Sequence, residues 1–368
     1  MDSFRYVSCA QEVIFAAGAL DRLAEATDRI GWKRLMLCTS PSMKSAGHSQ
    51  KSQDILGERI VVVYDHVKPH VQDFQVEESL SLARRHEVDA VIGLGGGSPI
   101  GMAKAVGFQS RLPILAVPTT YAGSEMTPVY GITYSQETPA RKVTVSDPKI
   151  TPSLVIYDPE LTLDLPPAVT ASTGINALAH CIEALYSKTR NPLSTAAAVR
   201  GVELIHSSLF ECYRNASGLQ ARAKMFTGAH LAGFSLASVS MGLHHGICHV
   251  LGGTAGIPHG IANGIMLPHA IRFNAQATAS QLLPAAKAMG IPVNGSRPAA
   301  VVEALSQAVS ELVRGMGLPQ RLRDAGVPLH QSDLSRLAQM AFNNPTVQNN
   351  PTPITGPAQI EALLEDAW

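Results

Sequence analysis

Hydrophobic residues are arranged differently in the two halves of the chain. In the first half, short apolar runs alternate with amphipathic segments such as Asp73–His86. The apolar runs are Arg34–Cys38, Ile60–Tyr64, Asp89–Leu94 and Ile114–Val117. Apolar strands that alternate with helices predict βαβ units on a parallel sheet. Three later segments, at 131–135, 141–147 and 153–158, also look extended, and for them we expect an antiparallel edge.

After Pro159 the strand pattern fades, and Ala- and Leu-rich sequence with helical spacing follows. A chain of 368 residues exceeds the size at which a single core usually stops growing. We therefore predict an α/β dinucleotide-binding domain over residues 1–158, with a Rossmann-like parallel sheet. An all-α catalytic domain is predicted over residues 159–368.

The amino-acid composition argues against some classes of function. The chain is 45% hydrophobic and 16% charged with a formal net charge of zero, which gives no basis for binding nucleic acid or a membrane surface. No apolar stretch is long enough to span a membrane, and the N-terminus lacks the pattern of a signal peptide. Five scattered cysteines without a CxxC pair suit a reducing compartment. We expect a cytoplasmic protein that acts on a small molecule.

A glycine-rich loop follows the third apolar run and precedes a helical segment, at Gly93–Ile100 (GLGGGSPI). Glycines let backbone amides approach an anion, and the N-terminus of the next helix favours negative charge. This pattern predicts a diphosphate site at Gly96, Gly97 and Ser98. It is neither a GxGxxG fingerprint nor a Walker loop, and a tight turn without a ligand is the alternative.

A second loop, Pro118–Glu125 (PTTYAGSE), follows the fourth apolar run. We expect Thr119, Thr120 and Ser124 to contact phosphate or ribose; the alternative is a turn that is simply rich in hydroxyl residues. After the first run, Thr39 stands where an acidic residue often binds a ribose. Without that acid a 2′-phosphate is not repelled, so NADPH is expected to serve as well as NADH.

Polar residues in helical spacing mark a second candidate site. Asn176 and His180 are four residues apart, as are His245 and His249, so each pair lies on one helix face. His259 follows in a Pro-His-Gly turn. These residues predict a site that holds a metal or moves a proton. Packing within a helical core is the alternative. Three further histidines have weaker cases, and a packing or surface position is an equal alternative for each: His230, His244 and His269.

These motifs resemble the iron-containing (group III) alcohol dehydrogenase family, and within it the maleylacetate reductase branch. The resemblance runs nearly end to end and is carried by residues 95–106, 118–131, 154–167, 172–186, 243–253 and 257–274. It implies a dehydroquinate synthase-like architecture, with a nucleotide domain followed by a helical domain. It also implies hydride transfer from NADH or NADPH, and a homodimer.

The family's metal ligands are an Asp and three His, and they fall here on Asn176, His180, His245 and His259. A neutral amide is a poorer ligand than a carboxylate for Fe or Zn, so the resemblance implies a degenerate site that we expect to be metal-free. His249 matches the family's additional histidine near the nicotinamide. A further departure is Gly101, where the general family has Asp; with Asn176 it points to the reductase branch.

The branch implies reduction of maleylacetate to 3-oxoadipate, in the degradation of aromatic compounds. Without a metal, imidazoles have to stabilise the developing negative charge and supply the proton. His245 and His249 are the candidates for this role, while His180 and His259 shape the pocket.

Other features leave the substrate open. The branch usually has Lys at the position of Gly246, and residues 260–263 are closer to the metal-dependent alcohol dehydrogenases. Arg141, Lys142 and Arg272 are candidates for binding carboxylate, but Lys142 suits the cofactor equally well and the arginines suit the surface. The alternatives are therefore a metal-dependent alcohol dehydrogenase or carbonyl reductase, a lyase of the dehydroquinate synthase type, and a non-catalytic nucleotide-binding protein.

Overall fold

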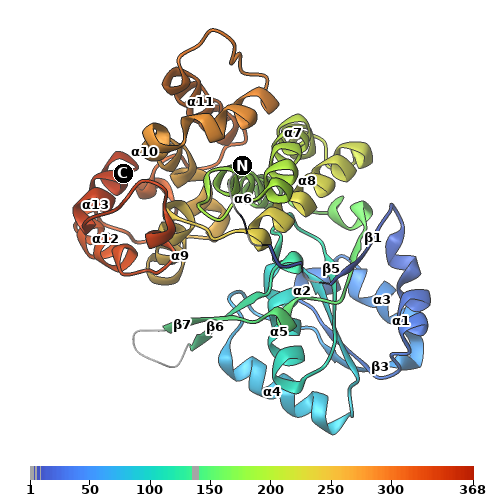
Figure 1. Cartoon of the computed structure of the whole chain (residues 1–368). Helices are drawn as coiled ribbons and strands as arrows, with labels where there is room; N and C mark the ends of the chain where they lie inside the picture. Colours follow the sequence, from blue (N-terminus) through green and yellow to red (C-terminus); the bar gives the residue numbers. More distant parts are fainter. Residues whose placement is uncertain (1–3, 5, 9, 135–140) are drawn as a thin grey trace. The chain divides into compact units, whose positions relative to one another are not determined.

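The computed structural model describes residues 4, 6–8, 10–134 and 141–368. They divide into unit 1, residues 1–7 and 166–368, and unit 2, residues 8–165 (Figure 1). The division falls after Leu165, later than the boundary that we expected after Asp158. Leu161, which follows the expected boundary, belongs to a core cluster of unit 2.

Unit 2 contains a six-stranded parallel sheet in the order β1-β8-β5-β4-β2-β3. Its strands are β1 (Glu12–Phe15), β2 (Leu35–Cys38), β3 (Ile60–Tyr64), β4 (Ala90–Gly95), β5 (Ile114–Pro118) and β8 (Leu154–Tyr157). Its helices are α1 (Leu23–Ile30), α2 (Pro41–Ser45), α3 (His48–Leu56), α4 (Asp73–Arg85) and α5 (Gly97–Ser110). The predicted parallel α/β architecture is confirmed.

The expected antiparallel edge is only partly right. A separate antiparallel hairpin does form, from β6 (Val129–Tyr134) and β7 (Arg141–Ser146). Residues 135–140, which include the end of one predicted segment, lie outside the described residues. The third segment becomes β8, which lies inside the parallel sheet between β1 and β5. All four residues of β8 are buried, so it belongs to the sheet's interior rather than to an edge.

Apolar residues cover both faces of the sheet, because side chains alternate along each strand. Met36 of β2 packs in a cluster with Val76 of α4 and Met102 of α5. Leu35 and Leu37 point to the other face, in a cluster to which α1 and α3 also contribute. This doubly wound arrangement leaves the loops after β4 and β5 next to each other, since the two strands are paired.

The helix α5 lies unusually close to β4. A Cβ placed on Gly93 would lie 2.9 Å from Ile100 Cα and 3.1 Å from the Pro99 carbonyl oxygen. Gly95 has a φ of +137°, a conformation that other residues rarely adopt. These glycines bring the start of α5 tightly against the carboxyl end of the strand.

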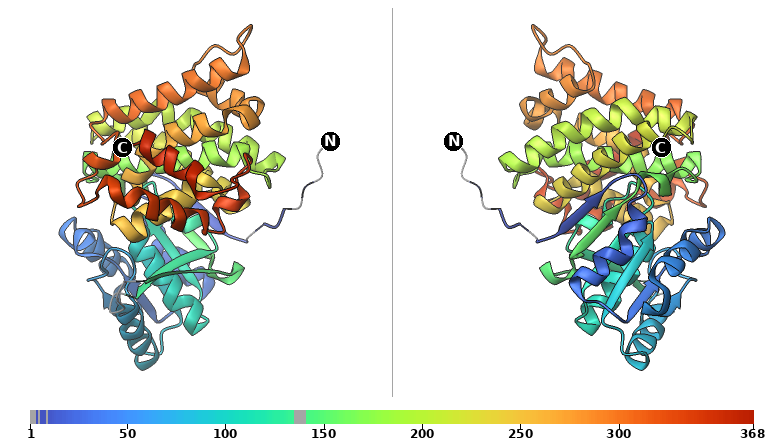
Figure 2. Two further views of the ribbon diagram at one scale, coloured as in Figure 1. Left: turned by 90° about the vertical axis from the view of Figure 1, so that its left-hand side faces the viewer. Right: turned by 90° about the vertical axis from the view of Figure 1, so that its right-hand side faces the viewer.

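The part of unit 1 after residue 166 consists of helices and connecting loops, coloured yellow-green to red in Figure 2. The α-helices are α6 (Pro167–Tyr186), α7 (Pro192–Arg214), α8 (Leu219–Ser238), α9 (Leu243–Ala255), α10 (His259–Ala288), α11 (Pro298–Gly315), α12 (Leu334–Phe342) and α13 (Pro357–Asp366). Asn191 caps α7 with Pro192 in the first turn, and Gly256 ends α9 at a φ of +73°. No described helix is both long enough and apolar enough to cross a membrane.

Replacement of Gly93 by Ala should lower the free energy of unfolding by about 1–3 kcal/mol, because the contacted atoms are backbone and cannot easily move. Urea unfolding followed by circular dichroism would measure the change. Gly97→Ala is the matched control: an added Cβ there meets no atom within 4 Å, so stability should change by less than about 1 kcal/mol. Equal destabilisation by both substitutions would contradict the close packing of α5 on β4.

Candidate active site

The two predicted nucleotide loops are in contact in unit 2. Gly97 is the first residue of α5, it is exposed, and an added Cβ would meet nothing within 4 Å. A Cβ on Gly96 would lie 3.1 Å from Thr120 Cγ2 of the second loop. The first N–H groups of a helix have no partner within the helix, so they are available to an anion here. Both loops can therefore contribute to one phosphate site.

The hydroxyl residues of these loops separate into two groups. Thr39 and Thr119 are buried; Thr39 donates a hydrogen bond to the Leu94 carbonyl at 3.0 Å, and Thr119 lies 3.4 Å from the sulfur of Met43. Thr39 thus links the ends of β2 and β4, whereas Thr119 contacts the helix α2. The remaining predicted cofactor contacts with hydroxyls, Ser98, Thr120 and Ser124, are partly exposed. The backbone of Lys142 lies in β7, but its side chain is outside the described part of the structure.

Gly101, the departure from the family's Asp, lies in α5 against the loop before α4. A Cβ at Gly101 would lie 3.0 Å from Val71 Cγ2. The neighbouring His70 donates its backbone N–H to Ser98 Oγ at 3.2 Å and has a φ of +58°. The absence of a side chain at Gly101 therefore leaves room for this loop to lie close to the start of α5.

In unit 1, the predicted histidines come together from three helices. His180 lies on α6, His245 and His249 lie on α9, and His259 begins α10. The ring centroids of His180 and His245 are 4.9 Å apart, and the rings are stacked. The ring centroid of His259 lies 6.0 Å from that of His245 and 5.9 Å from that of His249. Asn176 is buried one turn before His180 on the same helix. The structure thus brings these histidines close together, while the roles of the individual residues remain proposals.

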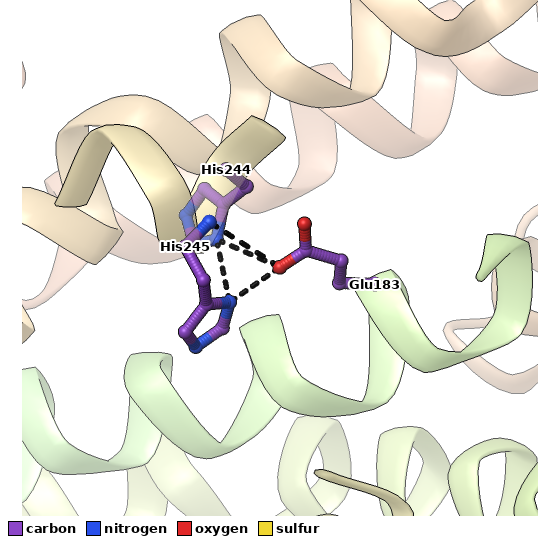
Figure 3. A group of neighbouring side chains, drawn as sticks. All are labelled: Glu183, His244 and His245. Atoms are coloured by element: carbon purple, nitrogen blue, oxygen red, sulfur yellow. Dashed lines mark hydrogen bonds and ion pairs between the residues drawn. The ribbon is translucent and has the colours of Figure 1, made fainter. Parts of the chain in front are cut away.

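Glu183, which the sequence reading did not single out, anchors this cluster. Its side chain is fully buried, and one carboxylate oxygen accepts the Gly242 backbone N–H at 2.8 Å. The other oxygen accepts a short hydrogen bond from His245 Nδ1 and a longer one, 3.3 Å, from the His245 backbone N–H (Figure 3). Glu183 follows His180 by three residues on α6, and that spacing could have revealed it.

Glu183 therefore fixes both the helix α9 and the tautomer of His245. A carboxylate at a helix N-terminus is stabilised by the helix dipole and by free N–H groups. Because Nδ1 of His245 donates to Glu183, Nε2 is left as the unprotonated nitrogen of a neutral ring. Nε2 of His245 and Nδ1 of His180 are buried and find no hydrogen-bond partner among the described residues. Two imidazole nitrogens are thus available to a ligand.

The charges of this buried group can be assigned. Burial opposes ionisation of Glu183, but the neighbouring histidines outweigh it and hold its pKa far below the usual range. Burial also opposes protonation of His244, yet contacts with Cys248 and Glu183 raise its pKa above the ordinary value. Burial lowers the pKa of His245 and His180. The positive charge thus rests on His244, which balances Glu183.

Glu183, His244 and His245 are also close enough together to be considered as a metal site. The contacts argue against it. His244 Nδ1 is 3.3 Å from His245 Nδ1 and 3.7 Å from the Glu183 oxygen, while the Glu183–His245 contact is a short hydrogen bond (Figure 3). Of these contacts, only the short Glu183–His245 hydrogen bond is closer than two ligands of one ion can lie when each is about 2.1 Å from the metal. Backbone N–H groups also occupy both carboxylate oxygens.

The family's own metal position fits a cation poorly in this chain. Asn176 supplies a neutral amide, and the three imidazoles of His180, His245 and His259 bring no negative charge. The residues present therefore fit hydrogen bonding to a substrate better than coordination of iron.

Two further sequence candidates can be placed. Gly246 is buried, and a Cβ there would lie 2.3 Å from Val347 Cγ2, so a lysine cannot replace it while η8 (Val347–Asn349) keeps its position. Arg272 forms an ion pair at 3.0 Å with Glu303, and both side chains are exposed. This placement agrees with the surface alternative for Arg272.

The substitution Glu183→Gln should lower the free energy of unfolding by about 3–5 kcal/mol, because it leaves buried donors and the charge of His244 uncompensated. Urea unfolding would measure this. Glu303→Gln serves as the control, since its ion pair is exposed and should contribute less than about 1 kcal/mol. Similar effects of the two substitutions would show that Glu183 does not anchor the cluster.

Comparisons with known proteins agree with this arrangement. The family description "Iron-containing alcohol dehydrogenase" matches residues 10–159, and "Fe-containing alcohol dehydrogenase family, C-terminal" matches residues 170–368. The chain is 37% identical over 368 residues to a maleylacetate reductase of Burkholderia cepacia, covering 100% of this chain and 98% of that protein.

Solved structures give the same result. The maleylacetate reductase of Agrobacterium tumefaciens is 32% identical with a TM-score of 0.88, over 100% of this chain and 99% of that one. An iron-containing alcohol dehydrogenase of Corynebacterium glutamicum is 32% identical with a TM-score of 0.87, over 100% and 97%. The chain belongs to the iron-containing alcohol dehydrogenase family.

Proposed function

We propose that this protein is a maleylacetate reductase that uses NADH or NADPH to form 3-oxoadipate. The observation that carries the proposal is the similarity to maleylacetate reductases along the whole chain. The histidine cluster supports it, because Asn176 replaces the carboxylate that an iron site would need. Oxidoreduction with a nicotinamide cofactor follows from membership of the family.

Unit 2 would bind the cofactor's diphosphate at the start of α5, through backbone N–H groups of Gly96, Gly97 and Ser98. Thr120 and Ser124 of the second loop would add contacts to phosphate or ribose. Neither Thr39 nor Ser40, the two residues that follow β2, is acidic. A 2′-phosphate therefore meets no repulsion there, and both NADH and NADPH are expected to bind.

Reduction requires a hydride and a proton. The bound cofactor supplies the hydride. Maleylacetate carries a C=C bond conjugated with a keto group, so addition of hydride to the distal carbon moves negative charge onto the keto oxygen as an enolate. That charge has to be stabilised by hydrogen-bond donors, and the neighbouring carbon then takes a proton.

We assign these tasks to the histidine cluster. His249 is exposed, so it can exchange protons with solvent, and it lies beside His259. His245 is held rigidly by Glu183 through Nδ1, so its Nε2 has to take up a proton before it can donate to the substrate oxygen. His180 and His259 would shape the pocket and orient the substrate. No step of this mechanism needs a metal.

Assembly and location complete the proposal. We infer that the protein forms a homodimer, as the family resemblance implies. A cytoplasmic location is consistent with a nicotinamide-dependent reaction and with the buried free thiols of Cys38, Cys181 and Cys248.

The test is oxidation of NADH and NADPH with maleylacetate, followed at the nicotinamide absorbance with and without a chelator. We expect turnover that the chelator does not change. His249→Gln should lower kcat by about 10²-fold, because the proton donor is lost. His330→Gln is the control, since this histidine is exposed and lies outside the cluster, and it should leave kcat unchanged.

Each alternative gives a different result. Metal-dependent oxidation of simple alcohols without turnover of maleylacetate would identify a dehydrogenase that acts on another substrate. Binding of cofactor without any turnover would identify a non-catalytic nucleotide-binding protein. Either result would overturn the proposal.

Asn176→Asp tests the degenerate metal position. The new carboxylate should raise affinity for Fe²⁺ or Zn²⁺ by at least about 10-fold, because a hard cation gains an anionic ligand. Isothermal titration calorimetry of the protein with Zn²⁺ would measure it. Asn215→Asp, at the end of α7, is the control for added charge alone. Unchanged affinity would show that more than one ligand has been lost.

A further inference from the structure

Lys104 is a buried charged residue in the nucleotide-binding unit that the proposed mechanism does not use. It lies in the middle of α5, the helix that begins at the glycine loop, and its side chain is fully buried. Burying an ammonium group is unfavourable unless hydrogen bonds compensate. An apolar side chain would fill the same space without this cost, so the contacts of the amine indicate what it does.

The Lys104 amine contacts a single stretch of chain directly after the second nucleotide loop. It donates to the carbonyl oxygens of Ser124, Thr127 and Val129, the last two at 2.7 and 2.9 Å. The hydroxyl of Thr127 lies at 3.0 Å. An ammonium has three N–H donors, and here all of them can meet oxygen. The side chain therefore links α5 directly to the segment 124–129.

The same segment is fixed from its other side. Glu125 is buried, and its carboxylate accepts a hydrogen bond from the Tyr157 hydroxyl of β8 at 2.7 Å. Gln11 donates to the Glu125 carbonyl at 2.9 Å. Burial lowers the pKa of Lys104 to about 7, while the charge of Glu125 acts in the opposite direction. The oxygen-lined site favours the protonated amine, because hydrogen bonds to the charged form stabilise it.

This segment carries the second nucleotide loop. Thr119 donates its backbone N–H to the Gly95 carbonyl at 3.1 Å, and Thr120 packs on Gly96. One end of the loop is thus held by the glycine loop itself. The other end, at Ser124, is held by Lys104. The position of the partly exposed hydroxyls between these ends depends on both attachments.

We propose that Lys104 is a positioning residue for the cofactor: its amine holds the loop Thr119–Ser124 against the start of α5 before the nucleotide binds. A loop that is already ordered loses less conformational entropy on binding, so affinity is higher. Lys104 does not itself contact the cofactor in this role. The inference rests on the proposed function only in taking the ligand to be a nicotinamide dinucleotide.

The test compares the full-length protein with Lys104→Met, which keeps an unbranched side chain but removes the donors. NADH and NADPH binding without substrate is measured by fluorescence titration. We expect Kd to rise at least about 10-fold for both cofactors, while kcat at saturating cofactor changes by less than about 3-fold. Lys33→Met, a surface lysine of the same unit, is the control and should leave Kd unchanged.

A purely structural role predicts a different pattern. Loss of folded protein would lower the active fraction and the melting temperature, but the folded molecules would bind cofactor with the original Kd. If Lys104→Met does not fold, Thr127→Val removes one oxygen contact only and should raise Kd by about 2- to 5-fold. Unchanged Kd in the folded variants overturns the inference.

Hydrogen exchange separates this inference from the proposed function. Backbone amides of residues 119–129 should exchange faster in Lys104→Met than in the original protein, with no cofactor present. If the original protein binds neither NADH nor NADPH, the proposed function fails, yet the exchange rates still test whether Lys104 orders the loop. Equal exchange rates would show that it does not.

Discussion

The buried carboxylate of Glu183 is the constraint on which the histidine cluster depends. An ionised carboxylate without solvent needs donors for its oxygens, and the chain supplies them from the start of α9 and from His245. The carboxylate sits on α6, so this single group fixes α9 against α6 and sets the tautomer of His245. His244 carries the balancing charge, which leaves His245 neutral. The position and chemistry of the cluster thus follow from one electrostatic requirement.

Unit 2 also contains a buried charged side chain that needs hydrogen-bond partners, but its charge is positive. There the buried Lys104 amine is surrounded by carbonyl oxygens of the segment that follows the second nucleotide loop. In both units a charged side chain on one helix satisfies polar backbone groups of another element. Apolar contacts alone would allow these elements to slide, whereas hydrogen bonds to fixed backbone atoms specify one arrangement. Glu183 and Lys104 each support residues that are proposed to contact the substrate or the cofactor. Neither charged side chain needs to touch the substrate or the cofactor itself.

The effect of Asn176, in place of the family's Asp, depends on the residues around it. In a metal site, Asn in place of Asp removes the negative charge of one ligand. Here the other imidazoles are stacked or tilted against each other within a buried cluster, and His245 is oriented by Glu183 rather than by a cation. Such a pocket can offer hydrogen bonds and a proton to a substrate oxygen. Gly246 and Val347 pack closely, and this packing leaves no room for a larger side chain at position 246.

Much of the fold and of the candidate site could be predicted from the sequence. Apolar runs alternating with helices specified the parallel sheet, and the glycine run specified the start of α5. The i,i+4 spacings of Asn176–His180 and His245–His249 showed which side chains share a helix face. These features are local, because strand and helix periodicity is a property of neighbouring residues.

Only the tertiary structure decided which distant segments meet. It placed β8 inside the sheet, since the choice of strand partners depends on how the helices pack on both faces. It buried Thr39 against the end of β4 and Thr119 beside Met43 of α2, and it brought Glu183 to the start of α9 and Lys104 to residues 124–129. The positions of Thr39, Glu183 and Lys104 depend on a buried polar group finding a partner far away in sequence, and periodicity carries no information about such partners.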